Sequence, residues 1–496
     1  MGFNSSFTPA PDHKIKINLG CGFDIISGRF VTGARNESLL NGGLSATTGF
    51  IGPGNFFKST QMHFQALTAM ARVANSEGGS YDTEVSMEKE RMANFSSNSI
   101  PDFKGEDVIG TGRWSITNSA IYSGNKWWEA EKTALQEKAK EKGIMIRTPY
   151  MNYNRTELFK TMRPTFREID SLSEWRSDRV DKILNETEIG DKEANMMYMT
   201  GGNDKTRLIA ELPNMTGKYS HYMLMSAHLG SRFNLDPRAP VRKQLQHIPQ
   251  DFKIKGVPEK FLFHMNNAWL CFSAELLRQD KGDKTVEYPR SSNDDNKNET
   301  DLNLIWVVQT RGKSGPSGMP LGVIVSQEEG VLPTLSEFHM CKLNDRYGIV
   351  GSKSAADVQN YSMALHPDVK LSRTTVRRKI DSDPLLRNAI LISSQMCQID
   401  NHWHDDITKM LMCTPQELFD DLRKKGYDWE TLLKMRNWVG IDADAEYDNH
   451  FLSTMDLLRM RLPHDHKLAY HPYWMAPRNA DGSVTTNEII EVKKLA

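Results

Sequence analysis

The sequence predicts an α/β protein with a largely parallel central sheet, followed by a mainly helical C-terminal region. Short apolar segments alternate with helix-forming segments up to about residue 355, which is the order expected when helices cover a parallel sheet. Beyond about residue 384 the pattern is helical, and Thr414-Pro-Gln-Glu417 has the form of a capping box. We therefore expect a tail over 1–13, a sheet domain over 14–355 with an insertion at about 86–163, a basic linker over 356–384 and a helical domain over 385–496.

Composition narrows the class of protein. The chain has 496 residues, 39% of them hydrophobic and 25% charged, which favours two or three globular domains over a fibrous or disordered chain. Neither a run of about 18 apolar residues nor a signal-peptide pattern is present, so we expect a cytoplasmic protein with no membrane partner. The five cysteines are scattered without a C-x-x-C pair, which favours reduced thiols. The net charge is −1, so binding to nucleic acid would require a local basic patch.

The segment Gly52-Pro-Gly-Asn-Phe-Phe-Lys58-Ser59-Thr60 has the spacing of a phosphate-binding loop, G-x-x-x-x-G-K-[ST], with Phe57 at the second glycine position. A predicted strand over 46–51 precedes it and a predicted helix over 61–71 follows it, so the helix N-terminus would face the phosphates. We expect this loop to bind a nucleoside triphosphate, with Ser59 holding Mg²⁺. The alternative is an ordinary strand-to-helix turn. The expected contact residues are Gly52, Pro53, Gly54, Asn55, Phe56, Phe57, Lys58, Ser59 and Thr60.

Three further polar residues follow predicted strands. Glu84 comes after a glycine-rich strand and could activate water, although a carboxylate there is also typical of a cap or a solvated turn. Asp170 closes the strand over 165–170 and is a candidate Mg²⁺ anchor. His228 ends the apolar strand over 222–228, where parallel sheets place their active sites; the alternative is a histidine satisfied within the core.

The segment 232–260 is the local basic patch, with seven lysines and arginines against three carboxylates. Its four prolines exclude a long helix or a central strand, so we expect a mobile loop. Clustered positive charge on such a loop suits binding to the phosphates of nucleic acid, and the alternative is a solvated surface. The candidate DNA-binding residues are Arg232, Arg238, Arg242, Lys243, Lys253 and Lys255.

The order of these motifs resembles the RecA recombinase family, and in style its T4-type phage branch. Gly52-Pro53 followed by Phe57-Lys58-Ser59 is similar to the loop of that branch, and the segment 17–28 with Gly42-Gly43-Leu44 is similar to the family's lead-in. The resemblance covers roughly residues 14–350. It departs in the long segment between Glu84 and Asp170, in a polar strand over 165–170 and in a short N-terminal tail. The C-terminal region resembles no family.

The resemblance implies a RecA-like ATPase core that uses ATP and Mg²⁺. Glu84 falls at the position of the family's catalytic glutamate, Asp170 at that of its Walker B aspartate and His228 at that of its γ-phosphate sensor. Arg311 and Lys313 fall in the segment whose basic side chains contact the ATP of a neighbouring subunit. The basic loop matches the second DNA-binding loop. The implied protein is a DNA-dependent ATPase that forms a filament or ring on single-stranded DNA, with recombination accessory proteins as further partners. The alternatives are a helicase or DNA motor, and a nucleotide-binding scaffold that hydrolyses little.

Overall fold

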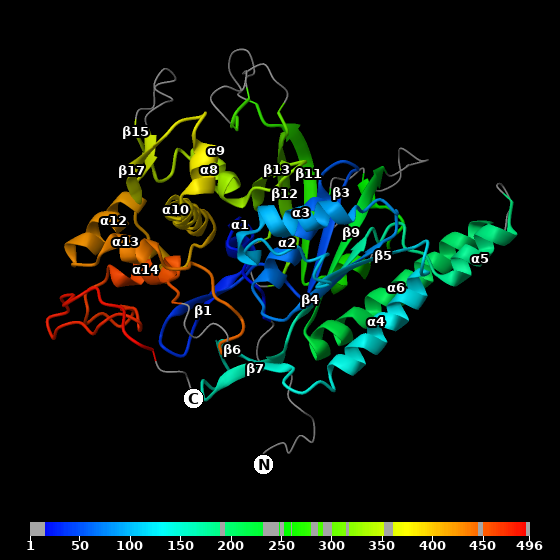
Figure 1. Cartoon of the computed structure of the whole chain (residues 1–496), viewed down its shortest axis with the longest axis horizontal. Helices are drawn as coiled ribbons and strands as arrows, with labels where there is room; N and C mark the ends of the chain where they lie inside the picture. The colour runs from blue at the N-terminus through cyan, green and yellow to red at the C-terminus, as the bar shows by residue number, and fades with distance from the viewer. Residues whose placement is uncertain are drawn as a thin grey trace.

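We describe a computed structural model of the chain (Figure 1). The described residues are 15–188, 194–231, 248, 252–258, 260–278, 286–290, 300–313, 317–351, 361–444 and 450–492. In this part of the chain no helix is both long enough and apolar enough to cross a membrane.

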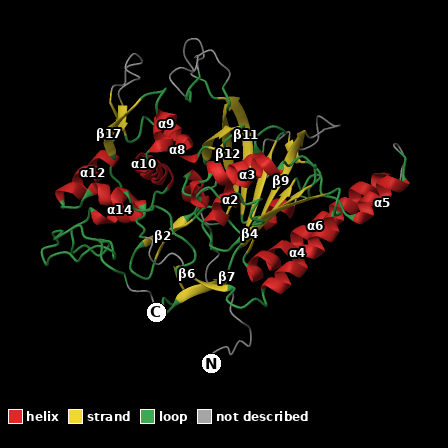
Figure 2. Cartoon of the chain, in the orientation of Figure 1, coloured by secondary structure: helices red, strands yellow, loops and turns green. Residues whose placement is uncertain are grey.

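One large mixed sheet forms the centre of the molecule (Figure 2). Its strands run in the order β14-β13-β12-β11-β3-β9-β8-β4-β5, and β10 pairs with β9. The six strands from β11 to β5 are parallel, and β10, β12, β13 and β14 add antiparallel pairs. The sheet consists of β3 (Thr47–Gly52), β4 (Glu77–Asp82), β5 (Trp114–Asn118), β8 (Thr165–Asp170), β9 (His221–Ser231), β10 (Phe252–Ile254), β11 (Asn267–Leu276), β12 (Leu302–Gly312), β13 (Pro320–Ser326) and β14 (Gly330–Val331). The predicted α/β class with a largely parallel sheet is confirmed.

The register brings the predicted site residues to one edge of the sheet. Gly52 of β3 lies opposite His228 of β9, and Asp170 of β8 lies opposite Asp82 of β4. All these strands are parallel, so their carboxyl ends meet at this edge, where ligands of open α/β sheets bind.

Both faces of the sheet are covered by a hydrophobic core. Successive side chains of the central strands point alternately into the two cores. Phe50 and Leu224 pack in one core with helix α2 (Lys58–Ala71) and α1 (Gly22–Ser27). Ile51 and Met225 face the other core, with α4 (Gly124–Lys138), α6 (Ala194–Tyr219) and α7 (Lys260–His264). This period of two is the pattern of strands buried on both faces.

The predicted insertion adds an edge to the sheet and a layer beyond it. It contains β5, α4 and the hairpin of β6 (Met145–Met151) and β7 (Leu158–Met162), after α3 (Lys89–Asn94), the π-helix η1 (Phe95–Ser99) and the short 3-10 helix η2 (Pro101–Phe103). Trp127 and Trp128 are buried, and Trp127 stacks on Tyr81, so they anchor α4 to the core. The helix α5 (Asp178–Glu186) packs on α6, and together they extend from the sheet at the right of Figure 1.

The rest of the chain packs beside β12 and β13. Its elements are β1 (Arg29–Thr32), β2 (Ser38–Asn41), α8 (Pro333–Leu343), β15 (Ile349–Gly351), β16 (Tyr361–Met363), β17 (His366–Leu371), α9 (Val376–Ser382), α10 (Pro384–His402), α11 (Asp406–Leu411), α12 (Pro415–Lys424), α13 (Trp429–Leu433) and α14 (Thr454–Met460). The capping box at Thr414 is present at the start of α12. Leu371, Val376 and Ile380 are buried in the C-terminal core, so the described part of the segment predicted as a basic linker is a small sheet and a helix. The basic residues of this segment therefore lie on folded elements. The apolar side chains between them are buried and hold these elements against the core.

Candidate nucleotide-binding site

The phosphate loop joins β3 to α2 in a strained turn. The helix begins at Lys58, and Phe57 before it has φ 52°, in the left-handed region. The motif usually has glycine at this position because glycine adopts positive φ without steric cost. Asn55 also has a positive φ of 60°. Phe57 thus adopts the backbone conformation that the motif requires, although its residue type departs from the motif.

The loop carries groups that can bind phosphate, and its backbone is open at one glycine. The Lys58 ammonium group donates a 2.6 Å hydrogen bond to the Pro53 carbonyl, and burial lowers the pKa of Lys58. A Cβ at Gly52 would lie 2.9 Å from the Cys271 carbonyl oxygen, whereas one at Gly54 would meet no atom within 4 Å. Gly52 is therefore needed for packing against β11, while the loop is open at Gly54.

The two hydroxyls after Lys58 differ in their surroundings. Thr60 is buried and accepts a 2.9 Å hydrogen bond from Arg91. Ser59 is half-buried and occupies the motif position whose hydroxyl binds Mg²⁺. The residues present therefore fit a triphosphate with Mg²⁺, held by the loop backbone, Lys58 and Ser59.

Glu84 is held at the carboxyl edge by two partners. His228 Nε2 lies 3.0 Å from Glu84 Oε1, and Ser171 Oγ donates to the same oxygen at 3.0 Å. Partial burial alone would raise the pKa of Glu84, but the hydrogen bonds from His228 and Ser171, with the charge of Lys58, outweigh it and lower the pKa. The carboxylate form is therefore favoured, as a group that orients or deprotonates water needs.

Asp82 is adjacent in sequence but has a structural role. Its carboxylate accepts the backbone N–H groups of Glu84, Ser86 and Met87 at 3.0, 2.7 and 2.7 Å. These bonds fix the turn after β4 and so set the position of Glu84. The Asp170 carboxylate accepts a hydrogen bond from the Ser226 hydroxyl on β9, and it remains the candidate Mg²⁺ anchor.

The structure also reveals residues that sequence reasoning missed. Ser173 Oγ accepts the backbone N–H of His228 at 2.9 Å and donates to the Lys255 carbonyl at 2.9 Å. Lys205, on α6, donates to the carbonyls of Ser173 at 2.6 Å and Gly256 at 2.7 Å. No motif contains these residues. A serine-rich segment directly after the Asp170 strand was the available signal.

The basic segment meets the site through β10. Lys253 lies opposite Gly230 on β9, and the Lys255 N–H donates to the His228 carbonyl at 2.8 Å. Two of the six predicted DNA-binding lysines and arginines are therefore next to His228. The other four, Arg232, Arg238, Arg242 and Lys243, lie outside the described residues.

Arg311 and Lys313 are at the other end of the sheet. Arg311 pairs with Ala268, Ala268 pairs with Gly49 near the start of β3, and the Arg311 guanidinium donates to the Met265 carbonyl at 3.1 Å. Since the phosphate loop follows the opposite end of β3, these two residues are not part of the phosphate site of their own chain.

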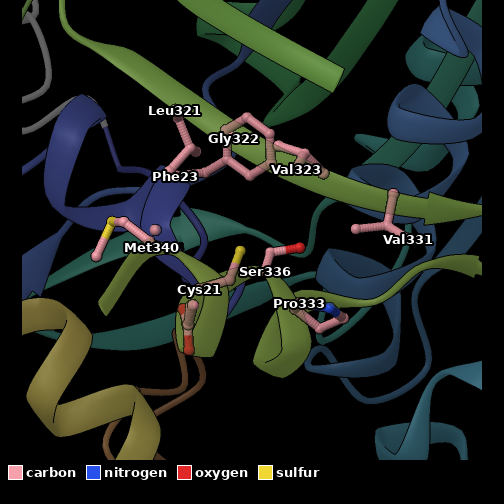
Figure 3. A pocket seen from close by; sticks show the side chains of 11 residues that line it. Cys21, Phe23, Leu321, Gly322, Val323, Val331, Pro333, Ser336 and Met340 are labelled. Carbon is pink, nitrogen blue, oxygen red and sulfur yellow. The ribbon is translucent and has the colours of Figure 1, made fainter. Parts of the chain in front are cut away.

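A small cavity of about 20 Å³ lies between α1, β13 and α8, lined by Phe23, Leu321, Val331 and Met340 (Figure 3). It has room for about one water molecule. This cavity is therefore too small to hold a nucleotide.

Comparisons with known proteins give a likeness in structure and none in sequence. No protein-family model matches the chain, and no curated protein matches it. A solved structure that is similar is the "Crystal structure of the RadB recombinase", with 12% sequence identity and a TM-score of 0.30, over 58% of this chain and 92% of that one. The function proposed below is based on the geometry of the phosphate loop and of the carboxyl edge.

Proposed function

We propose that the protein is an ATP-dependent recombinase of the RecA type that binds single-stranded DNA as an oligomer. One observation carries the proposal: Glu84 is hydrogen-bonded to His228, which lies within β9 opposite Gly52, the last residue of β3 before the phosphate loop, and the His228 carbonyl is bonded to the basic segment at Lys255. A carboxylate that can activate water, a phosphate loop and a candidate DNA-binding segment therefore share one short path through hydrogen bonds.

Each residue has a role in hydrolysis. Lys58 and the loop backbone hold the phosphates, and Ser59, supported by Asp170, holds Mg²⁺, which supplies positive charge to the phosphate oxygens when it is bound. Glu84 orients or deprotonates the attacking water. Ser171 and His228 keep the Glu84 carboxylate ionised and aligned, and a phosphate near His228 would compete with Glu84 for its Nε2.

Assembly and DNA binding complete the proposal. Arg311 and Lys313 lie at the opposite end of the sheet from the phosphate loop of their own chain, so we assign them to the ATP of a neighbouring subunit in a filament or ring. The basic segment 232–260, including Lys253 and Lys255, is the proposed contact to the phosphates of single-stranded DNA.

The test is ATP hydrolysis and strand exchange by the parent and by Lys58→Ala. The parent should hydrolyse ATP faster with single-stranded DNA and exchange strands, whereas Lys58→Ala should do neither while keeping the parent's circular dichroism. Mixing Lys58→Ala with Arg311→Ala should restore part of the activity, since each contributes the half of the shared site that the other lacks.

The outcomes separate the classes of protein. DNA-stimulated hydrolysis without strand exchange would indicate a helicase or motor instead. Nucleotide binding without DNA-stimulated hydrolysis would indicate a scaffold. Hydrolysis by Lys58→Ala at the parent's rate would contradict the phosphate-loop assignment itself.

A further inference from the structure

A second hollow lies between the sheet domain and the C-terminal helices, with a volume of about 810 Å³. We call it the interdomain cleft, and its walls are the β1–β2 hairpin, the end of β12, α11 and α14. Ser38 N–H donates to buried Asp456 at 2.9 Å, and Arg459 donates to the Asn36 carbonyl at 2.8 Å. These buried contacts fix the hairpin against α14, so the shape of the cleft is set by the fold. Its volume is within the range of small-molecule sites, about 300–1,000 Å³.

The cleft is positively charged although the whole chain is not. Its lining has four cationic side chains and one carboxylate, against a net charge of −1 for the chain. Arg459 is paired with Asp456 at 3.0 Å, and the carboxylate, Asp405, caps α11 by accepting from Thr408 at 2.9 and 2.7 Å. The remaining cations, Arg29, Lys313 and Lys467, come from three separate segments and are exposed.

Two of these cations are not paired with another side chain of the described residues. Within the described residues, the Arg29 guanidinium and the Lys467 ammonium group make no ion pair or side-chain hydrogen bond. Cations converging on a hollow from separate segments create a positive potential that attracts an anion with several charges.

The lining also includes an aromatic pair. Phe30 and Trp403 meet edge to face with ring centroids 5.3 Å apart, and both are half-buried. Stacking on aromatic side chains is the common way in which proteins bind a nucleobase irrespective of its identity. Cations alone would suit any polyanion, whereas cations with aromatic rings suit a phosphate ester that carries a base.

We propose that the interdomain cleft is a second nucleotide-binding site, which takes the phosphate and base of a nucleotide unit between Arg29, Lys467 and the Phe30–Trp403 pair. Such a unit is supplied by a free mononucleotide or by a strand of nucleic acid. Lys313 at the edge of the cleft is the residue assigned above to the ATP of a neighbouring subunit, whereas Arg29, Lys467 and the Phe30–Trp403 pair have no role in the function proposed above. Gly312 of the cleft pairs with Asn267, and Asn267 pairs with Thr48 near the start of β3, so the cleft is at the opposite edge of the sheet from the phosphate loop.

Charge reversal tests the cleft in the full-length protein. The double variant Arg29→Glu/Lys467→Glu is compared with Lys142→Glu/Lys424→Glu, which makes the same change in net charge at exposed positions outside the cleft. The probes are a six-nucleotide oligothymidylate carrying photoreactive 4-thiothymine, and thymidine monophosphate. Affinity is measured by titration, and the crosslinked residues are mapped by mass spectrometry.

The parent should crosslink at Phe30 or Trp403, and the cleft variant should lose these crosslinks and bind the probe roughly tenfold more weakly than the control variant. If thymidine monophosphate also binds, and is weakened by Arg29→Glu/Lys467→Glu as the oligonucleotide is, a free nucleotide is a ligand of the cleft. If only the oligonucleotide binds, the ligand is a strand of nucleic acid. ATP hydrolysis without DNA should be the same in both variants, which separates this site from the phosphate loop.

Three results would overturn the proposal. They are the absence of crosslinks at Phe30 and Trp403 in the parent, equal affinity of the cleft and control variants, and displacement of the oligonucleotide by hexaglutamate as effectively as by unlabelled oligothymidylate. The last result would show that the cleft recognises charge without a base.

Discussion

His63 Nδ1 on α2 lies 2.8 Å from Glu168 Oε2 on β8, and both side chains are buried. The same carboxylate oxygen accepts a 2.8 Å hydrogen bond from Ser80, which in turn accepts one from the Trp114 indole at 3.0 Å. His63 is five residues after Lys58, and Glu168 is two residues before Asp170. The pair therefore connects the helix that begins with the phosphate-binding lysine to the strand that ends with the proposed Mg²⁺ anchor.

Removing one partner of this pair should be far worse than removing both. His63→Leu leaves the Glu168 charge buried with a hydroxyl as its main partner, and breaking a buried pair in this way costs about 3–5 kcal/mol. The double variant His63→Leu/Glu168→Leu removes both polar groups and should lose less than His63→Leu. Urea unfolding of the parent, the two single variants and the double variant gives the coupling energy. Additive losses would show that the two side chains do not interact.

The same pair should make stability depend on pH. Burial alone would lower the pKa of His63, but the Glu168 carboxylate outweighs it, with a smaller contribution from Asp170 that opposes Arg91, and raises the pKa above 6.5. A raised folded-state pKa contributes stability that is fully present below the unfolded pKa and is lost as pH rises through the folded value. The advantage of the parent over His63→Gln in unfolding free energy should therefore be larger at about pH 5.5 than at about pH 8.5, on either side of the ordinary histidine pKa. A constant difference would contradict the assignment of the charged pair.

Phe57 should be replaceable by residues that tolerate positive φ. A left-handed conformation costs a residue with a side chain roughly 1–2 kcal/mol, and asparagine adopts it more readily than most residues. We expect Phe57→Gly and Phe57→Asn to keep ATP affinity, and Phe57→Val to lose it because a β-branched side chain resists this conformation. Nucleotide titration with thermal unfolding measures both effects. Equal affinity in all three would show that φ at this position is unimportant.

Glu84→Gln should separate binding from turnover. The change preserves shape and removes the carboxylate, so ATP affinity should remain while hydrolysis falls by about 10²–10⁴, the range of general-base catalysis. Glu88→Gln, an exposed residue four positions further on, is the matched control and should behave as the parent. Parallel losses of affinity and rate in Glu84→Gln would indicate a structural carboxylate.

Local patterns were enough to predict the elements, but not the contacts between distant segments. The phosphate loop between strand and helix and the Thr414 capping box depend on neighbours within a few residues, and both elements are present. The polar strand over 165–170 was a departure from the family pattern. The structure explains it by partners from distant segments: Glu168 meets His63, and Arg167 meets Glu131 at 2.8 Å. These partners are brought together by strand order, which periodicity and composition do not determine.

Lys205 should couple DNA binding to hydrolysis. Its ammonium group is buried, which lowers its pKa to about 8, and it holds the carbonyls of Ser173 and Gly256. Ser173 bonds in turn to Lys255 on the basic segment and to His228 beside Glu84. In Lys205→Met the side chain keeps its length but both hydrogen bonds are lost, so Ser173 and the turn at Gly256 are no longer held together by Lys205. The direct bond from the Lys255 N–H to the His228 carbonyl remains, so we expect the basic segment to stay in place while Ser173 is less firmly positioned.

We therefore expect Lys205→Met to keep ATP hydrolysis without DNA and most of its affinity for single-stranded DNA, and to lose the stimulation of hydrolysis by DNA. Lys218→Met, an exposed position on the same helix, is the matched control and should be stimulated as the parent is. The two unpaired carbonyls cost about 1–3 kcal/mol each, so thermal unfolding first establishes a temperature at which both variants are folded. If Lys205→Met is stimulated as strongly as the control, the path from Lys255 through Ser173 to His228 does not carry the effect of DNA to the catalytic carboxylate.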